Sequence, residues 1–122
     1  MKRDFDLLRN ILLTVEECEE VPPKTLRIES FLDLCDNPAV VSMHLQLLKD
    51  AGFLECRAIS RNDYIKGFEI ERITFAGYEY LDSIRNAKIW RDVKEKIAVV
   101  GGATFDIIKA VAINELKKEL QI

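Results

Sequence analysis

Apolar residues recur every three or four positions near the start of the chain, which is the spacing of one helical face. The stretch from Phe5 to Val15 has this spacing, and Asp4 or Asp6 precedes it as a candidate N-cap. Two consecutive prolines at 22–23 follow a run of glutamates, so we expect the helix to end before them. Residues 25–32 then alternate apolar and polar positions, which predicts a short strand.

The middle of the chain carries signals for a helix, a strand, a turn, a strand and a helix, in that order. An Asn-Pro pair at 37–38 marks a helix start, and Gly52 stands where a left-handed glycine ends helices. Runs at 54–59 and 68–73 predict two antiparallel strands joined by a polar turn. Thr74 is the expected N-cap of the next helix.

The C-terminal third predicts further helices, broken at Gly101 and Gly102. Phe75, Tyr78 and Trp90 stand at helical spacing from aliphatic residues, so we expect them in the core. The last helix, at about 104–120, is apolar over a wide arc and must bury it. It could fold onto the first helix or pair with its copy in a second subunit. We expect a homodimer, and the candidate interface residues are Phe105, Ile108, Ala112, Leu116 and Leu120.

Together these elements predict an α+β fold that is mostly helical. The helix–strand–turn–strand–helix order is typical of a winged helix-turn-helix with a short β-hairpin wing and, here, extra C-terminal helices. A length of 122 residues fits a single domain. We expect a winged-helix core at 1–86 and a helical extension at 87–122.

Charge and cysteine content narrow the class of protein. The net charge is −3, which argues against a strongly basic nucleic-acid binder. The three cysteines, Cys18, Cys35 and Cys56, are widely spaced with no CxxC, as in reduced cytosolic proteins. The charged N-terminus lacks the apolar stretch of a signal peptide, and no apolar run is long enough to span a membrane. We therefore expect a cytoplasmic protein.

The helix before the wing is the element that enters the major groove in proteins of this shape. Its side chains Ser42, His44 and Gln46 can hydrogen-bond base edges, and Lys49 can reach a phosphate. Cations of the hairpin could lie along the DNA backbone. The DNA-binding candidates are Ser42, His44, Gln46, Lys49, Arg57, Arg61 and Lys66. In the alternative interpretation this helix only packs against the first one, or binds a protein, and the hairpin is solvated.

Other chemistry finds little support in the sequence. His44 is the one histidine, and no partner for it is encoded nearby, so no catalytic residue is predicted. No spacing of cysteine, histidine or carboxylate residues predicts a metal site, and Gly101-Gly102 lacks the context of a phosphate loop. We expect no cofactor. The cations between 85 and 96 are interpreted as a solvated helix face.

Nearly the whole chain resembles a family of small, uncharacterised bacterial and phage-encoded proteins with a winged-helix-like core. The matching motifs are Met1-Lys2-Arg3-Asp4, Leu7-Leu8-Arg9, Ile11-Leu12-Leu13, His44-Leu45, Leu47-Leu48, Ala51-Gly52, Leu54, Ile73-Thr74, Gly77, Tyr80-Leu81-Asp82, Ile89-Trp90, Lys94-Glu95-Lys96, Gly101-Gly102, Phe105-Asp106 and Ile108-Lys109-Ala110. The segment from Ile73 to Gly77 is also similar to the Leu-Thr-x-x-Gly helix start of bacterial transcription regulators, with Ile in place of Leu. These resemblances imply the fold and no activity.

The expected function is that of a non-enzymatic, winged-helix DNA-binding protein or transcription regulator, derived from a phage or mobile element. Its expected partner is double-stranded DNA. The alternative is a protein–protein interaction module that keeps the winged-helix shape without binding DNA, which the acidic N-terminal half would suit.

Overall fold

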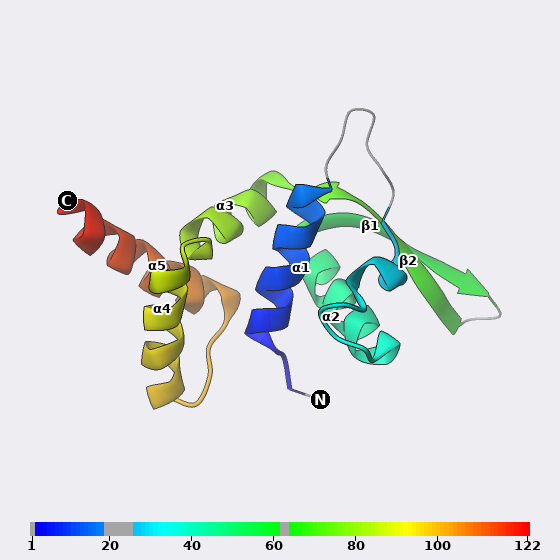
Figure 1. Cartoon of the computed structure of the whole chain (residues 1–122), viewed down its shortest axis with the longest axis horizontal. Helices are drawn as coiled ribbons and strands as arrows, with labels where there is room; N and C mark the ends of the chain where they lie inside the picture. The colour runs from blue at the N-terminus through cyan, green and yellow to red at the C-terminus, as the bar shows by residue number, and fades with distance from the viewer. Residues whose placement is uncertain (1, 19–25, 62–63) are drawn as a thin grey trace. The chain divides into compact units, whose positions relative to one another are not determined.

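The computed structural model describes residues 2–18, 26–61 and 64–122, and for residues 60, 61 and 64–66 it describes the backbone alone. The described chain is an α+β fold, mostly helical, with five α-helices and one antiparallel hairpin (Figure 1). It divides into two compact units, unit 1 (Met1–Tyr78) and unit 2 (Glu79–Ile122). The division falls inside a helix, earlier than the boundary expected at 86/87. None of the described helices is long and apolar enough to cross a membrane.

Helix α1 (Phe5–Glu17) opens unit 1 as the apolar spacing predicted. Asp4 is its N-cap, and the Asp4 carboxylate accepts a hydrogen bond from the backbone N–H of Leu7 at 3.1 Å. The face with helical spacing is fully buried at Leu8, Ile11 and Leu12. The prolines at 22–23 lie outside the described residues.

The segment predicted as a strand at 25–32 is mostly a helical turn. Among its described residues, 26–32, only Leu26 pairs with the sheet, and it exchanges two backbone hydrogen bonds with Ile70. A short 3-10 helix, η1 (Ile28–Phe31), follows at once. Ser30 explains the difference: its hydroxyl accepts from the Arg27 N–H at 3.2 Å, and its own N–H donates to the Arg27 carbonyl. Such local side-chain bonds compete with strand pairing.

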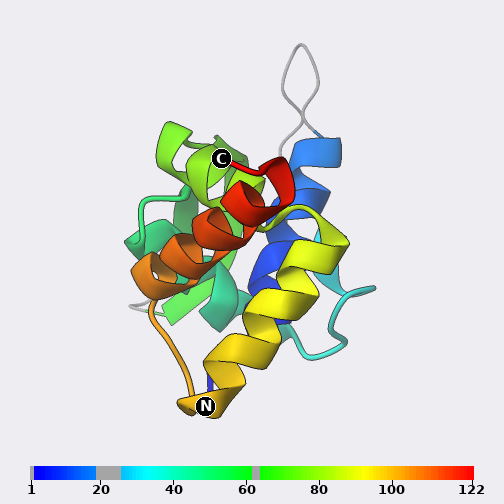
Figure 2. The same ribbon diagram turned by 90° about the vertical axis from the view of Figure 1, so that its left-hand side faces the viewer.

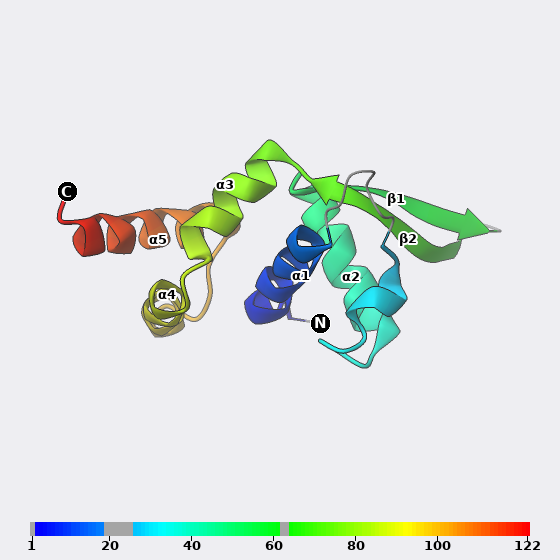
Figure 3. The same ribbon diagram turned by 45° about the horizontal axis from the view of Figure 1, so that its top comes forward.

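Helix α2 (Pro38–Asp50) has the predicted ends. Asn37 is the N-cap and accepts from the Ala39 N–H at 3.1 Å, with Pro38 at the first turn. The helix stops at Gly52, whose φ of 77° lies in the left-handed region that glycine occupies without strain. Its buried side packs against α1, η1 and the hairpin (Figure 3).

Strands β1 (Leu54–Arg61) and β2 (Tyr64–Ile73) form the hairpin, and both are longer than predicted. They pair antiparallel with Leu54 opposite Ile73, and irregularities in register follow Glu55 and Ile59. The inner side of β2 is buried at Phe68, Ile70 and Ile73. The hairpin therefore has one face on the core of unit 1 and one face toward solvent.

Helix α3 (Phe75–Ile84) is tied to the end of α2 at its first turn. The Thr74 hydroxyl donates to the Gly52 carbonyl and accepts from the Gly77 N–H, so Thr74 caps the helix as predicted. The Thr74 N–H also donates to the Phe53 carbonyl at 3.0 Å. Phe75 was expected in the core, but its side chain is 78% exposed. Phe75 is the first residue of α3, so no earlier turn of the helix shows which face it occupies, and the helical spacing predicted its burial poorly.

Helices α4 (Ala87–Val99) and α5 (Phe105–Leu120) pack together in unit 2 (Figure 2). Asn86 caps α4 through its side chain, which separates α4 from α3. The glycine break is confirmed, since Gly101 and Gly102 have φ values of 81° and 146°. Thr104 caps α5 at the Ile107 N–H. Trp90 is 3% exposed, as expected for a core residue.

Candidate nucleic-acid interface

The outward face of α2 is formed by residues at i, i+3, i+4 and i+7. Ala39 is exposed, and Ser42, Met43 and Gln46 are partly exposed. The opposite face is buried in unit 1 at Val41, Leu45 and Leu48. Two of the predicted DNA-binding residues, Ser42 and Gln46, therefore do lie together on the accessible side of the helix.

Gln46 is held by a neighbour one turn further along the helix. Its amide nitrogen donates a hydrogen bond to the Asp50 carboxylate, with Nε2 and Oδ1 2.7 Å apart. The pair has i,i+4 spacing, which brings side chains together on a helix surface. The second amide N–H and the amide oxygen of Gln46 take no part in this bond.

His44 was predicted to face bases or solvent, and this prediction is wrong. The side chain is fully buried. Its Nε2 accepts from the Asp4 backbone N–H at 2.9 Å, and its Nδ1 lies 2.8 Å from the Val40 carbonyl. With Nδ1 protonated, both ring nitrogens are satisfied, and His44 links α2 to the N-cap of α1. Helical phase alone missed this because position 44 is close to the edge of the buried stripe.

The described arginines of the hairpin are paired with glutamates of the same hairpin. Arg57 forms an ion pair with Glu69, directly opposite on β2, and this partner raises the pKa of the guanidinium. Arg72 pairs in the same way with Glu55, with Nε and Oε2 2.7 Å apart. The Arg27 guanidinium is 4.0 Å from Glu69 on its other side. All three arginine side chains are more than half exposed, so water screens these pairs.

Two predicted DNA-binding residues lie at the turn of the hairpin. The side chains of Arg61 and Lys66 lie outside the described residues. Their backbones belong to β1 and β2, close to where the strands meet the turn.

Lys49 is the single cation of α2, and its side chain is partly exposed. Burial raises the pKa of the Cys56 thiol on β1, and the positive charge of Lys49 acts in the opposite direction. The carboxylates of Glu71 and Asp50 raise the same pKa further. The charges of Lys49, Glu71 and Asp50 therefore all act on the Cys56 thiol.

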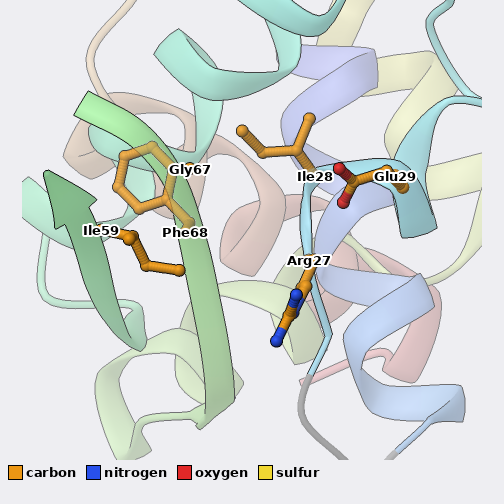
Figure 4. A pocket seen from close by; sticks show the side chains of 6 residues that line it. All are labelled: Arg27, Ile28, Glu29, Ile59, Gly67 and Phe68. Atoms are coloured by element: carbon orange, nitrogen blue, oxygen red, sulfur yellow. The ribbon is translucent and has the colours of Figure 1, made fainter. Parts of the chain in front are cut away.

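A largely apolar hollow of about 520 Å³ lies between α2, η1 and β2. Its lining residues are Ile28, Pro38, Ala39, Ser42, Met43, Gln46, Leu47 and Phe68. A second hollow of about 320 Å³ shares two of these residues, Ile28 and Phe68, and extends to Ile59 on β1. Figure 4 shows this second hollow, with Ile28 on the η1 side and Phe68 on β2.

The predicted dimer residues on α5 do not form one exposed face. Ile108 and Ala112 are fully buried within the chain, so their assignment to a dimer interface is wrong. Phe105 packs edge-on against Tyr80, with ring centroids 5.0 Å apart. Leu116 is partly exposed and Leu120 is 67% exposed. A dimer through α5 stays a prediction for its exposed apolar residues, which also include Ile107 and Ile113.

The basic stretch of unit 2 is largely engaged in ion pairs. Arg85 pairs with Asp82, Lys88 with Glu119 and Lys96 with Glu115. The last two pairs join α4 to α5, and the Lys96 hydrogen bond lowers the pKa of the Glu115 carboxyl. Among the described residues there is also no group of three or more side chains suited to hold a metal ion.

With this geometry in view, sequence comparison places the chain among known proteins. A family profile described as "Hypothetical protein (DUF2513)" matches residues 2–103. The chain belongs to the DUF2513 family. It is also similar to an uncharacterized protein of Haemophilus influenzae strain Rd, with 36% identity over 114 residues that cover 92% of each chain. No solved structure matches the chain significantly. The expected resemblance to small uncharacterised bacterial proteins is thus confirmed, and the DUF2513 assignment carries no activity with it.

Proposed function

We propose that unit 1 is a winged-helix DNA-binding module and that the protein is a non-enzymatic, transcription-regulator-like protein. The observation that carries the proposal is the pairing of Leu26 with Ile70. This pairing is a single bridge from Leu26 to β2, and it is followed by η1 and α2. The resulting order of helix, bridge, short helix, helix, hairpin and helix supports a winged-helix assignment. In this order α2 is the recognition helix.

The surface of α2 supports the same function. Ser42 and Gln46 are partly exposed beside the hairpin and offer hydrogen-bonding groups of the kind that read base edges. The hairpin arginines Arg57 and Arg72 are bound to glutamates, but an exposed ion pair is weak, so a DNA phosphate can compete for the guanidinium.

Charge sets limits on how the module would bind. Unit 1 carries ten Lys/Arg and fourteen Asp/Glu residues, a net charge of −4. Because phosphate neutralisation supplies most of non-specific affinity, we expect weak binding to arbitrary DNA. Affinity for a specific site would then depend on contacts between α2 and the bases.

A pair of matched alanine variants tests the proposal. Ala39 lies in the first turn of α2, and Ala87 is the first residue of α4; both are exposed. A glutamate is compatible with the start of either helix, so both variants should fold. Ala39→Glu places a carboxylate where DNA phosphates would lie and should weaken binding of a labelled duplex by about tenfold or more. Ala87→Glu adds the same charge to unit 2 and should not; equal effects of the two variants would count against α2 as the reading helix.

A protein-interaction module is the second candidate, and the apolar hollow beside α2 favours it. Met43, Leu47 and Phe68 give this hollow a surface better suited to a protein side chain than to a phosphate. Capture of one stoichiometric protein partner, lost in Met43→Glu, together with no measurable DNA binding, would support this candidate over the first.

A further inference from the structure

The side chains that α2 turns outward are uncharged, except for the exposed Asp50 at the end of the helix. Ala39 and Met43 offer apolar surface, Ser42 a hydroxyl and Gln46 an amide. From Pro38 to Asp50 there is no arginine, and the single lysine stands at the flank of this face. The face therefore lacks the side chain that makes the commonest specific contact to guanine.

The two kinds of base pair present different groups in the major groove. Guanine presents two acceptors, which arginine or lysine binds, whereas adenine presents a donor and an acceptor, which an amide matches. Thymine adds a methyl group, which apolar side chains contact. The outward set on α2, an amide beside apolar groups, matches an A·T pair.

The bond between Gln46 and Asp50 strengthens this match. Because Asp50 accepts one amide N–H at 2.7 Å, the Gln46 amide is oriented before DNA arrives. The remaining N–H and the amide oxygen are the donor and the acceptor that the adenine edge requires. Preorganisation of this kind lowers the entropy cost of forming the contact.

We infer that α2 reads A·T base pairs in the major groove, with Gln46 contacting adenine, Ala39 and Met43 contacting thymine methyl groups, and Asp50 acting as a positioning residue for Gln46. This inference rests on the proposed DNA-binding function. Beyond that function, the inference names the class of DNA sequence, A·T base pairs, that unit 1 selects.

The test is selection of binding sites from a pool of duplexes with a randomised core, using the full chain at low salt. The wild-type protein should enrich sites with A·T pairs. Gln46→Ala should reduce the preference at one base pair by about tenfold while the rest of the site is unchanged. Gln46→Arg should shift that position toward guanine. Gln121→Ala replaces the other glutamine of the chain, at the end of α5, and should leave the selected site unaltered.

Asp50→Ala separates positioning from simple charge. If Asp50 only repels DNA, its loss should raise the affinity for every duplex equally and leave the base preference unchanged. If Asp50 positions Gln46, the preference at the position that Gln46 reads should also weaken, as in Gln46→Ala. An unchanged preference in Asp50→Ala would overturn its assignment as a positioning residue.

The outcomes distinguish this inference from the proposal beneath it. Binding without base preference, or an enriched site rich in G·C pairs, would overturn the A·T reading while DNA binding by unit 1 stands. A preference for A·T pairs that survives both Gln46 variants would overturn the role of Gln46. Failure to enrich any duplex, with no binding to the starting pool, would overturn both.

Discussion

Arg57 and Glu69 stand directly opposite each other on β1 and β2, and their side chains form an ion pair on the solvent side of the hairpin. Arg57 was predicted to contact DNA, and in the free protein it instead contacts a carboxylate of its own hairpin. In the DNA-binding account, Glu69 competes with phosphate for the same guanidinium. The glutamates of the hairpin would then limit the binding of its arginines to phosphate.

Removal of this competitor should strengthen DNA binding. Glu69→Gln removes the charge that pairs with Arg57 and lies near Arg27. We expect tighter duplex binding and a salt dependence that is steeper by about 0.9 in log–log slope for each phosphate newly contacted. Glu71→Gln is the matched control, because it removes an equal charge from β2 that acts on Arg57 through space without pairing directly with it. The affinity for the duplex is measured by fluorescence anisotropy at several salt concentrations. If both variants increase the affinity equally, only the net charge matters.

His44 should be important for stability and not for base contact. His44→Ala leaves the Asp4 backbone N–H without its acceptor and opens a cavity under α1. We expect the free energy of unfolding to fall by about 2–4 kcal/mol, measured by urea denaturation. Ser42→Ala, on the outward side of the same helix, should stay within about 0.5 kcal/mol of the wild type. A His44→Ala variant that keeps its stability and loses only DNA affinity would restore the original prediction.

Gly77 should tolerate no side chain. A Cβ at this position would collide with the Phe53 carbonyl oxygen and with the Ile73 side chain, where the start of α3 passes the turn between α2 and β1. Gly77→Ala should therefore destabilise the protein by about 1–3 kcal/mol, with a lower Tm. Gly67→Ala, in β2 with open space around the position, is the control and should be close to neutral. Equal Tm values for the two variants would contradict the close approach at Gly77.

Glu115 should make stability depend on pH in the acid range. The Lys96 hydrogen bond lowers the pKa of the Glu115 carboxyl from its ordinary value of 4.5, so the folded state binds this proton less readily than the unfolded state. The stabilising contribution is complete above pH 4.5 and is lost as the pH falls through the lowered pKa. Unfolding curves for Glu115→Gln should therefore differ from wild type at neutral pH and converge with it in acid. As a control, Glu95→Gln changes an exposed residue of α4 and should show the same dependence of stability on pH as the wild type. If the stabilities of Glu115→Gln and the wild type do not converge in acid, Glu115 is not the source of the pH dependence.

The sequence predicted the elements well because their signals are local. The Asn37-Pro38 start, the Gly52 end, the Thr74 cap and the Gly101-Gly102 break each depend on a few adjacent residues, and each is confirmed. The strand at 25–32 failed because one serine bond favours a turn at Ser30.

The partners of individual side chains were harder to predict because they depend on distant segments. The burial of His44 requires the N-cap of α1, forty positions away in the sequence, and no local pattern encodes that meeting. The same holds for the Arg57–Glu69 pair, which depends on strand register. On α5, two apolar arcs share one helix, and spacing could not show that Ile108 and Ala112 face inward. Ser42 and Gln46 are partly exposed because they lie opposite a clear apolar stripe, and their contact with DNA stays a prediction.

DNA recognition by unit 1 can be measured as the binding of a labelled, mixed-sequence duplex to the full chain, followed by fluorescence anisotropy at low salt and then at rising salt. We expect weak binding, with a dissociation constant of about micromolar or above. The affinity should fall steadily as salt increases, because phosphate contacts release counterions. No change in anisotropy even at low salt, or binding that salt does not affect, would contradict DNA recognition by unit 1 and would favour a protein partner at the hollow beside α2.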